Sequence, residues 1–319
     1  MNTAYLHRHK DFSDLLNIVE NETGIIAGLI EKDYWIMQVL YGLKSQGFRF
    51  ELKGGTSLSK GFNIIERFSE DIDIHITPPL EMGINENPNN SKSANIRKKK
   101  EFYDWLTNQI KIDGIVDVQR DHAFDNVKNY NSGGIRLLYE QKTNPMSGLK
   151  DGILLEVGFD RVTPNTPVLI SSWAYERAKQ QIAVEIVDNR AKEIACYNPG
   201  YTFVEKLQTI ATKFRNEQKE GSVQQPNYMR QYYDIYCLLA NQEVLDFIGT
   251  EEYQNHKKIR FPKEDYDLPI WENEAFLLTD KALRDNFKKR YERIKALYYN
   301  GQPGFDDLLE RIKEKIDQL

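Results

Sequence analysis

The sequence lacks several features that mark common protein classes. Its 319 residues include only two cysteines, Cys196 and Cys237, and neither has a metal-ligand spacing, so no disulfide framework or zinc site is expected. No apolar run approaches the roughly 20 residues that cross a bilayer. The first residues, MNTAYLHRHKDF, lack the apolar core of a secretory signal. We therefore expect a protein without contact to a membrane, located in the cytoplasm.

The chain also lacks a strong charge of either sign. Its formal net charge is -5, and such mild acidity argues against a general coat for nucleic acid. One local cluster is basic and comprises Lys92, Arg97, Lys98, Lys99 and Lys100. This cluster either contacts phosphates or, as is more common for a charge run, forms a solvated helix face.

What is present is enough apolar and aromatic material for a large core. Hydrophobic residues make up 40% of the chain, with 18 tyrosines and 15 phenylalanines, and the length suits one large domain or two ordinary ones. Helical periodicity dominates the first fifty residues and returns after Pro199. Between them, alternating apolar residues predict strands at 48–52, 71–77, 133–140, 152–159 and 168–170, and helical spacing predicts helices at 57–67 and 95–110.

This order of elements predicts an α+β fold with two parts. Residues 1–195 would form a core in which N-terminal helices flank a mixed sheet. Residues 196–319 would form a helical domain. The reason to assign that core to phosphoryl chemistry lies in one segment, KGGTSLSKGFNIIERFSEDIDIHI, which begins at Lys53.

The first half of this segment is suited to binding a polyphosphate. Gly54 and Gly55 end a predicted strand, and glycines allow backbone N–H groups to approach phosphate oxygens without a Cβ in the way. Thr56 and Ser57 follow at the start of a predicted helix, where unpaired N–H groups attract anions. These four residues are candidate nucleotide ligands.

The second half of the segment carries two acidic residues on one strand face. Asp71 and Asp73 alternate with isoleucines in DIDIHI, so their side chains share a face with Cα atoms roughly 6.5–7 Å apart. Two such carboxylates can converge on Mg²⁺ or Mn²⁺, which would bridge them to nucleotide phosphates. The alternative is a solvated edge strand, but a glycine pair one helix earlier favours the metal site.

At this point the sequence resembles a known family. A G-G-T/S motif followed by D-h-D is similar to the DNA polymerase β-like nucleotidyltransferases, and KGGTSLSKGF with RFSEDIDI resembles the AbiEii/AbiGii toxin family. Further blocks in the family order are EKDYW at 31–35, LLEVGFD at 154–160, EKL at 205–207 and MRQYYDIYCL at 229–238. The resemblance implies a toxin of a type IV toxin–antitoxin or abortive-infection pair, whose antitoxin acts without a stable complex. It also implies NTP substrates, and some relatives add nucleotides to the acceptor end of tRNA.

Glu156 is a third candidate metal ligand and the candidate general base. It is the lone charge in the apolar strand GILLEVGF, where an unpaired carboxylate would be costly. A position beside Asp71 and Asp73 would resolve that cost and would allow Glu156 to take a proton from an acceptor hydroxyl. The alternative is a half-exposed strand residue paired with Arg136.

Three further candidates lie outside the sheet positions described so far. By resemblance, Lys206 and Asp234 match the EK and R-x-x-Y-D blocks of the family, which implies catalytic roles and, for Lys206, contact with the triphosphate. Without the resemblance both would be ordinary helix residues, with Asp234 in a surface ion pair with Arg230. Ser69, directly before the acidic strand, either contacts phosphate or caps a turn.

Together these features predict an enzyme that transfers a nucleoside monophosphate from an NTP to a hydroxyl group and releases pyrophosphate. The acceptor would be RNA such as tRNA, or protein. Three alternatives remain: a transferase that modifies a small molecule such as an antibiotic, an NTP-sensing module without catalysis, and an RNA-binding protein that uses the basic cluster at 92–100.

Overall fold

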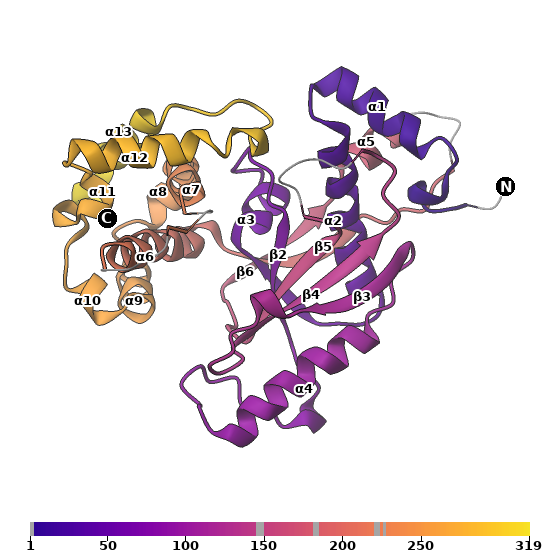
Figure 1. The fold of residues 1–319 in the computed structure, drawn as a ribbon, viewed down its shortest axis with the longest axis horizontal. Helices are drawn as coiled ribbons and strands as arrows, with labels where there is room; N and C mark the ends of the chain where they lie inside the picture. The colour runs from indigo at the N-terminus through magenta and orange to yellow at the C-terminus, as the bar shows by residue number, and fades with distance from the viewer. Residues whose placement is uncertain (1–2, 145–149, 181–184, 220–223, 226–227) are drawn as a thin grey trace. The chain divides into compact units, whose positions relative to one another are not determined.

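The structure, a computed structural model, describes the chain except for residues 1–2, 145–149, 181–184, 220–223 and 226–227. By its internal contacts the chain divides into two compact units (Figure 1). The first unit contains Met1–Gly61 and Phe68–Tyr197, and the second contains Phe62–Arg67 and Asn198–Leu319. The sequence also predicts a turn around Asn144, Pro145 and Gly148, and most of that turn lies outside the described residues.

A seven-stranded mixed sheet forms the centre of the first unit, which confirms the α+β prediction. The strand order is β3-β4-β5-β2-β1-β7-β6. Strand β2 runs parallel to β5, β1 runs parallel to β7, and the remaining neighbours are antiparallel. The strands are β1 Phe50–Lys53, β2 Asp71–Ile76, β3 Ile115–Asp121, β4 Ser132–Tyr139, β5 Ile153–Gly158, β6 Asn165–Ile170 and β7 Ala191–Tyr197.

Helices cover the apolar face of this sheet. Ile74 of β2 and Gly133 of β4 both pair with Val157 of β5, so the three residues lie on one face. A Cβ at Gly133 would meet the ring of Tyr103 from helix α4, Ser93–Gln109. Tyr139 lies on the same face of β4 and stacks on Trp35 of helix α2, Ala27–Ser45. Helix α2 runs behind the strands in Figure 1. The opposite face is left for polar side chains.

Two shorter helices complete this unit near α2. They are α1, Phe12–Thr23, and α5, Trp173–Lys179. Both contact α2, and they also contact each other. The first fifty residues are thus helical up to Ser45, as their periodicity predicts.

The segment between β1 and β2 differs from the prediction of a helix at 57–67. Helix α3, Gly54–Thr56, continues into a π-helical turn, Ser57–Gly61, and the helical conformation then ends. Asn63 has a φ of 53°, which a continuing α-helix does not allow. Residues Phe62–Arg67 belong by their contacts to the second unit, where Arg67 forms a β-bridge with Tyr298.

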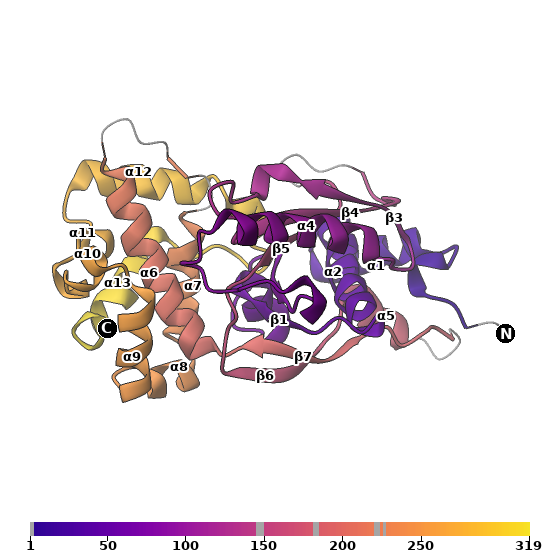
Figure 2. The same ribbon diagram turned by 90° about the horizontal axis from the view of Figure 1, so that it is seen from below.

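The second unit is helical apart from that bridge within the described residues, and Figure 2 shows its helices gathered together. Helix α6 contacts α7, α8, α9 and α11, and α13 packs on α7. The bounds are α6 Pro199–Glu217, α7 Arg230–Leu238, α8 Gln242–Phe247, α9 Glu251–Arg260, α10 Lys263–Tyr266, α11 Glu274–Leu277, α12 Lys281–Glu292 and α13 Phe305–Lys315. Among all described residues, none forms a helix that is both long and apolar enough to cross a membrane.

Candidate active site

The three predicted carboxylates lie on one face of the sheet. Asp73 is paired in register with Lys53 of β1 and with Glu156 of β5, and directly paired strand residues point to the same face. Asp71 lies two residues earlier on β2 and therefore shares that face. The sheet thus brings Glu156 beside two acids that precede it by more than 80 positions in the sequence. We call the side occupied by Asp71, Asp73 and Glu156 the acidic face.

The glycine turn lies directly against the acidic face. Gly54 has a φ of 71°, a conformation that favours glycine. A Cβ placed on Gly54 would collide with the carboxylate oxygen Oδ2 of Asp73. The Asp73 carboxylate therefore occupies the place that a side chain at position 54 would need, and the glycine permits this approach.

The two hydroxyl residues after the glycines are buried. Thr56 is 0% exposed, and its Oγ1 donates a hydrogen bond to the carbonyl oxygen of Asp71 at 2.6 Å. This bond joins the start of the helical segment to the first residue of the acidic strand. Ser57 is also 0% exposed, and its hydroxyl faces the buried thiol of Cys196. Burial raises the pKa of that thiol to about 12, although the neighbouring Ser57 hydroxyl opposes the shift.

Arg136, the alternative partner of Glu156, has other contacts. Its Nε donates to Asp121 Oδ2 at 2.9 Å, and its Nη1 donates to the carbonyl of Asp151 at 2.7 Å. Glu156 is half-buried within an otherwise buried strand. Its register partner on β4 is Gly134, which carries no side chain that would cover the carboxylate. Ser69, directly before β2, is half-buried as well.

The donor set of the acidic face suits a divalent cation. In the described part of the chain, the Oδ1 atom of Asp71 is buried and accepts no hydrogen bond, a costly state that a metal or another donor would relieve. No group of three or more His, Cys, Asp or Glu side chains among these residues could hold a metal by itself. Mg²⁺, however, commonly uses one or two carboxylates and completes its shell with phosphate oxygens and water. The geometry therefore fits a cation shared with a bound phosphate.

Three lysines border the acids. Lys53 begins the segment discussed from the sequence, whereas Lys150 and Lys32 were not singled out there. Lys53, the register partner of Asp73, has its Nζ 3.3 Å from Asp160 Oδ2. The Nζ of Lys150 lies 3.5 Å from Asp71 Oδ2. Lys32 is buried, and its Nζ lies 3.9 Å from Glu70. Positive charge around the carboxylates suits an anionic ligand.

Through its EKDYW block, helix α2 contacts both the glycine-turn segment and the residue before the acidic strand. Burial raises the pKa of Asp33, which is fully buried, although its Oδ1 lies 2.6 Å from Nζ of Lys60 in the glycine-turn segment. The next residue back, Lys32, donates to the carbonyl of Lys150 at 2.5 Å. The sequence held a signal for these site residues, because the EKDYW block places three consecutive charged residues in a helix that the protein buries on all sides.

Lys206 and Asp234 come together in the second unit, and Arg67 joins them. Arg67 donates two hydrogen bonds of 2.7 Å to the two carboxylate oxygens of Asp234, and Lys206 Nζ lies 2.9 Å from Oδ2. Asp234 is 0% exposed, so the alternative of a surface ion pair is wrong. Burial by itself would raise the pKa of Asp234, but both cations outweigh it and hold the pKa below its ordinary value. Asp234 thereby fixes the position of two cations.

The basic cluster at 92–100 is not a continuous exposed patch. Lys99 is 0% exposed, and its Nζ donates to Asn131 at 2.6 Å. Lys98 donates to the carbonyl of Gly83 at 3.0 Å, and Arg97 lies 3.7 Å from Glu101. These contacts are typical of a helix that packs on its own unit.

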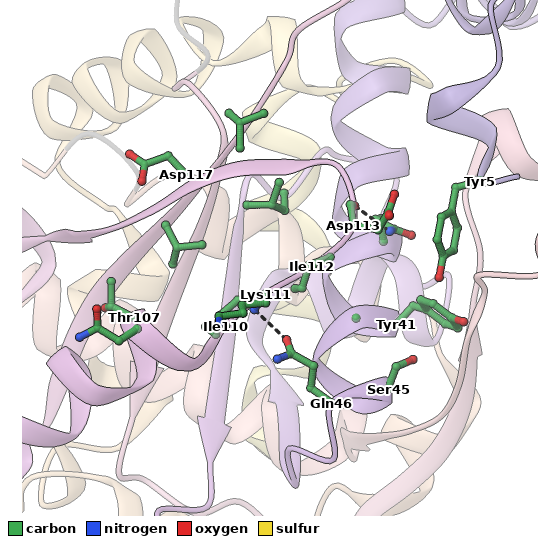
Figure 3. Close-up of a pocket in the computed structure, with 16 residues that line it drawn as sticks. Tyr5, Tyr41, Ser45, Gln46, Thr107, Ile110, Lys111, Ile112, Asp113 and Asp117 are labelled. Carbon is green, nitrogen blue, oxygen red and sulfur yellow. Dashed lines mark hydrogen bonds between the residues drawn. The ribbon is translucent and has the colours of Figure 1, made fainter.

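A cavity of about 740 Å³ lies elsewhere in the first unit, between α2 and the connection from α4 to β3 (Figure 3). Tyr5, Tyr41 and Asp113 are among the residues that line it, and none of the predicted site residues does. Gln46 on its wall accepts a hydrogen bond from the N–H of Lys111 at 3.0 Å. The candidate site is therefore assigned by its chemistry and not by this cavity.

Comparison with known proteins agrees with this chemistry. Residues 38–311 match the family described as nucleotidyl transferase AbiEii toxin, type IV toxin–antitoxin system. No curated protein matches the chain. One solved structure, an antigenic nucleotidyltransferase-like protein from Paracoccidioides brasiliensis, is 14% identical, with 72% of this chain and 87% of that chain covered. Its TM-score of 0.35 is too low to establish a shared fold.

The matched range includes the glycine pair, all three carboxylates of the acidic face, and the Lys206–Asp234 pair. It begins after the EKDYW block and spans most of the chain. The protein is therefore a nucleotidyltransferase that belongs to the AbiEii toxin family of type IV toxin–antitoxin systems.

Proposed function

We propose that the protein uses Mg²⁺ or Mn²⁺ to transfer a nucleoside monophosphate from an NTP to a hydroxyl group of RNA, with tRNA as the first acceptor to test and protein as the second. The observation that supports this most directly is the register of Asp73 with Glu156, next to a glycine that the Asp73 carboxylate nearly touches. The cytoplasmic location, and an antitoxin that acts without a stable complex, belong to the same proposal.

In this proposal each group on the acidic face has one task. A divalent cation held by Asp71 and Asp73 would neutralise charge that develops on the phosphates. Glu156 takes the proton of the acceptor hydroxyl, whose oxygen then bonds to the α-phosphorus while the bond to the leaving pyrophosphate breaks. The Thr56 hydroxyl is already bonded to Asp71, and the Ser57 N–H is already bonded to the carbonyl of Gly54. Thr56 therefore contributes its backbone N–H beside those of Gly54 and Gly55, and Ser57 contributes its hydroxyl. Ser69 and Lys206 are assigned to the phosphates, and Asp234 positions Lys206.

The test is transfer of label by purified protein. Each of the four NTPs, labelled at the α-phosphate, is incubated with total tRNA or cell lysate and with Mg²⁺ or Mn²⁺. We expect labelled RNA and released pyrophosphate, and we expect EDTA to abolish both. Asp73→Asn should reduce the rate at least about 100-fold, the scale seen when one preorganised electrostatic group is lost.

A matched variant separates this effect from general damage to the sheet. Asp117→Asn changes an exposed aspartate on β3 of the same sheet, and we expect it to keep the wild-type rate. Equal rates for the Asp73 and Asp117 variants would refute the assignment of the acidic face. Label that appears only in lysate protein would replace RNA with protein as the acceptor.

A further inference from the structure

Lys150 is a cation at the border of the acidic face. Its Nζ lies 3.5 Å from Asp71 Oδ2 and 4.5 Å from the centre of the Phe124 ring. Its side chain is 36% exposed. The contact with Asp71 is at the long limit for a hydrogen bond, so the ammonium is held mainly by charge and by the aromatic face.

The main chain of Lys150 is fixed more firmly than its side chain. Its carbonyl accepts a hydrogen bond of 2.5 Å from Lys32, and its N–H donates to Glu70 Oε1 at 3.4 Å. Lys32 and Glu70 are both buried. The backbone therefore presents the lysine at a constant place, while the ammonium keeps the freedom to change partners.

Phe124 reaches this place because position 134 is a glycine. A Cβ on Gly134 would lie 2.8 Å from the Cβ of Phe124, which is closer than real Cβ contacts allow. Gly134 is the register partner of Glu156. The Phe124 ring, which faces Lys150, is thus packed beside the register pair of Gly134 and Glu156, the proposed general base.

We propose that Lys150 is a movable counter-ion, which neutralises Asp71 in the empty site and binds the NTP phosphates once a divalent cation has taken its place. This inference rests on the proposed function. A cation on Asp71 repels the ammonium at this short distance, and a triphosphate offers it several negative oxygens. Lys32 interacts electrostatically with Asp71 and Lys150, and also with Glu70 and Arg136. Lys32, Glu70 and Arg136 each already have a partner.

Two opposite effects of one substitution test the proposal. We expect Lys150→Gln to bind Mn²⁺ alone about two- to fivefold more tightly, because a partly exposed ion pair no longer competes. We expect the same variant to bind an NTP in the presence of Mn²⁺ about tenfold more weakly, because a charged contact to phosphate is lost. Electron paramagnetic resonance of free Mn²⁺ and calorimetry measure the two affinities without any turnover.

Lys142→Gln is the matched control. The side chain of Lys142 is also 36% exposed and pairs with a carboxylate, with its Nζ 2.7 Å from Glu140. Loss of this charge should leave both affinities at wild-type values. Lys150→Met, which keeps an apolar stem next to Phe124, is a second form of the test should Lys150→Gln fold poorly by circular dichroism.

The results distinguish this inference from the proposed function. Unchanged or weaker Mn²⁺ binding by the Lys150 variants, or unchanged NTP binding, would overturn the role of Lys150. Asp71→Asn should abolish Mn²⁺ binding. If wild type and Asp71→Asn bind Mn²⁺ equally, the metal site of the proposed function fails instead.

Discussion

The Asp73 carboxylate occupies the place that a Cβ on Gly54 would need, so even the smallest side chain at position 54 should have an effect. We expect Gly54→Ala to lower the free energy of unfolding by about 1–2 kcal/mol because of its positive φ. The added methyl group must also displace Asp73, and a displacement of this kind reduces a rate by about 100-fold. Thermal unfolding and the labelled-transfer assay measure the two effects separately.

Gly24 provides the control for that substitution. It has a φ of 73°, close to the 71° of Gly54, but no atom lies within 4 Å of the place that an added methyl group would occupy. Gly24→Ala should therefore show a similar loss of stability with full transfer activity. If both alanine variants lose activity alike, backbone strain and not the contact with Asp73 explains the effect.

The sequence alone was sufficient to place Asp71 and Asp73 together, but it did not reveal the lysine beside them. Alternation in DIDIHI was enough to place Asp71 and Asp73 on one face, because the period of a strand is local. Lys150 could not be found in this way. Its place beside Asp71 depends on the parallel pairing of β2 with β5, which no local pattern determines, and nothing in its own neighbourhood distinguishes it from other lysines.

Among the helices, the element to test is α7, whose Asp234 holds Arg67 and Lys206. We expect Asp234→Asn to lower the free energy of unfolding by about 3–5 kcal/mol, because it leaves two cations around a buried neutral group. Asp306 is the matched control, since it also pairs with one arginine and one lysine, at 2.7 Å and 2.9 Å, but its side chain is 47% exposed. Asp306→Asn should cost less than about 1 kcal/mol.

The buried ion pairs of Asp234 also predict how the free energy of unfolding depends on pH. The pKa of Asp234 is lowered in the folded protein, so its contribution to stability is fully present above the ordinary value of 3.8. It disappears as the pH falls through the lowered pKa. Denaturant titrations from pH 7 downward should show a loss below that range in wild type, and the Asp234→Asn variant should lack this part of the slope. Parallel curves for the two proteins would contradict the role of Asp234.

The elements predicted well are those whose signal is local. Strands β2, β4 and β5 have strong apolar alternation or apolar runs, and they lie within one or two residues of their predicted bounds. Strands β3 and β7 were not predicted. Strand β3 lies at the sheet edge with much of its surface exposed, and β7 is stabilised by parallel pairing with β1 about 140 residues earlier. The helix predicted at 57–67 stops at Gly61 because contacts with distant residues outweigh its helical spacing.

For the whole molecule, membership in the toxin family predicts growth arrest. We expect induced expression without an antitoxin to stop bacterial growth, and we expect Asp73→Asn at the same protein level to permit it. Colony counts after induction, with immunoblots for protein level, provide the measurement. Normal growth with active wild-type protein, together with inactivation of an aminoglycoside, would favour the small-molecule transferase.

The segment Phe62–Arg67 has a consequence for how the enzyme is made. It leaves the ribosome between the diglycine and the acidic strand, yet its partners are far downstream: Arg67 bonds to Asp234, 167 positions later, and Glu66 to Asn300, 234 positions later. An incomplete nascent chain can therefore contain every carboxylate of the acidic face while the segment Phe62–Arg67, which joins Asp71 and Asp73 to the glycines, still lacks its hydrogen-bond partners. We therefore expect the active centre to be complete only after Asp234 and Asn300 have been synthesised.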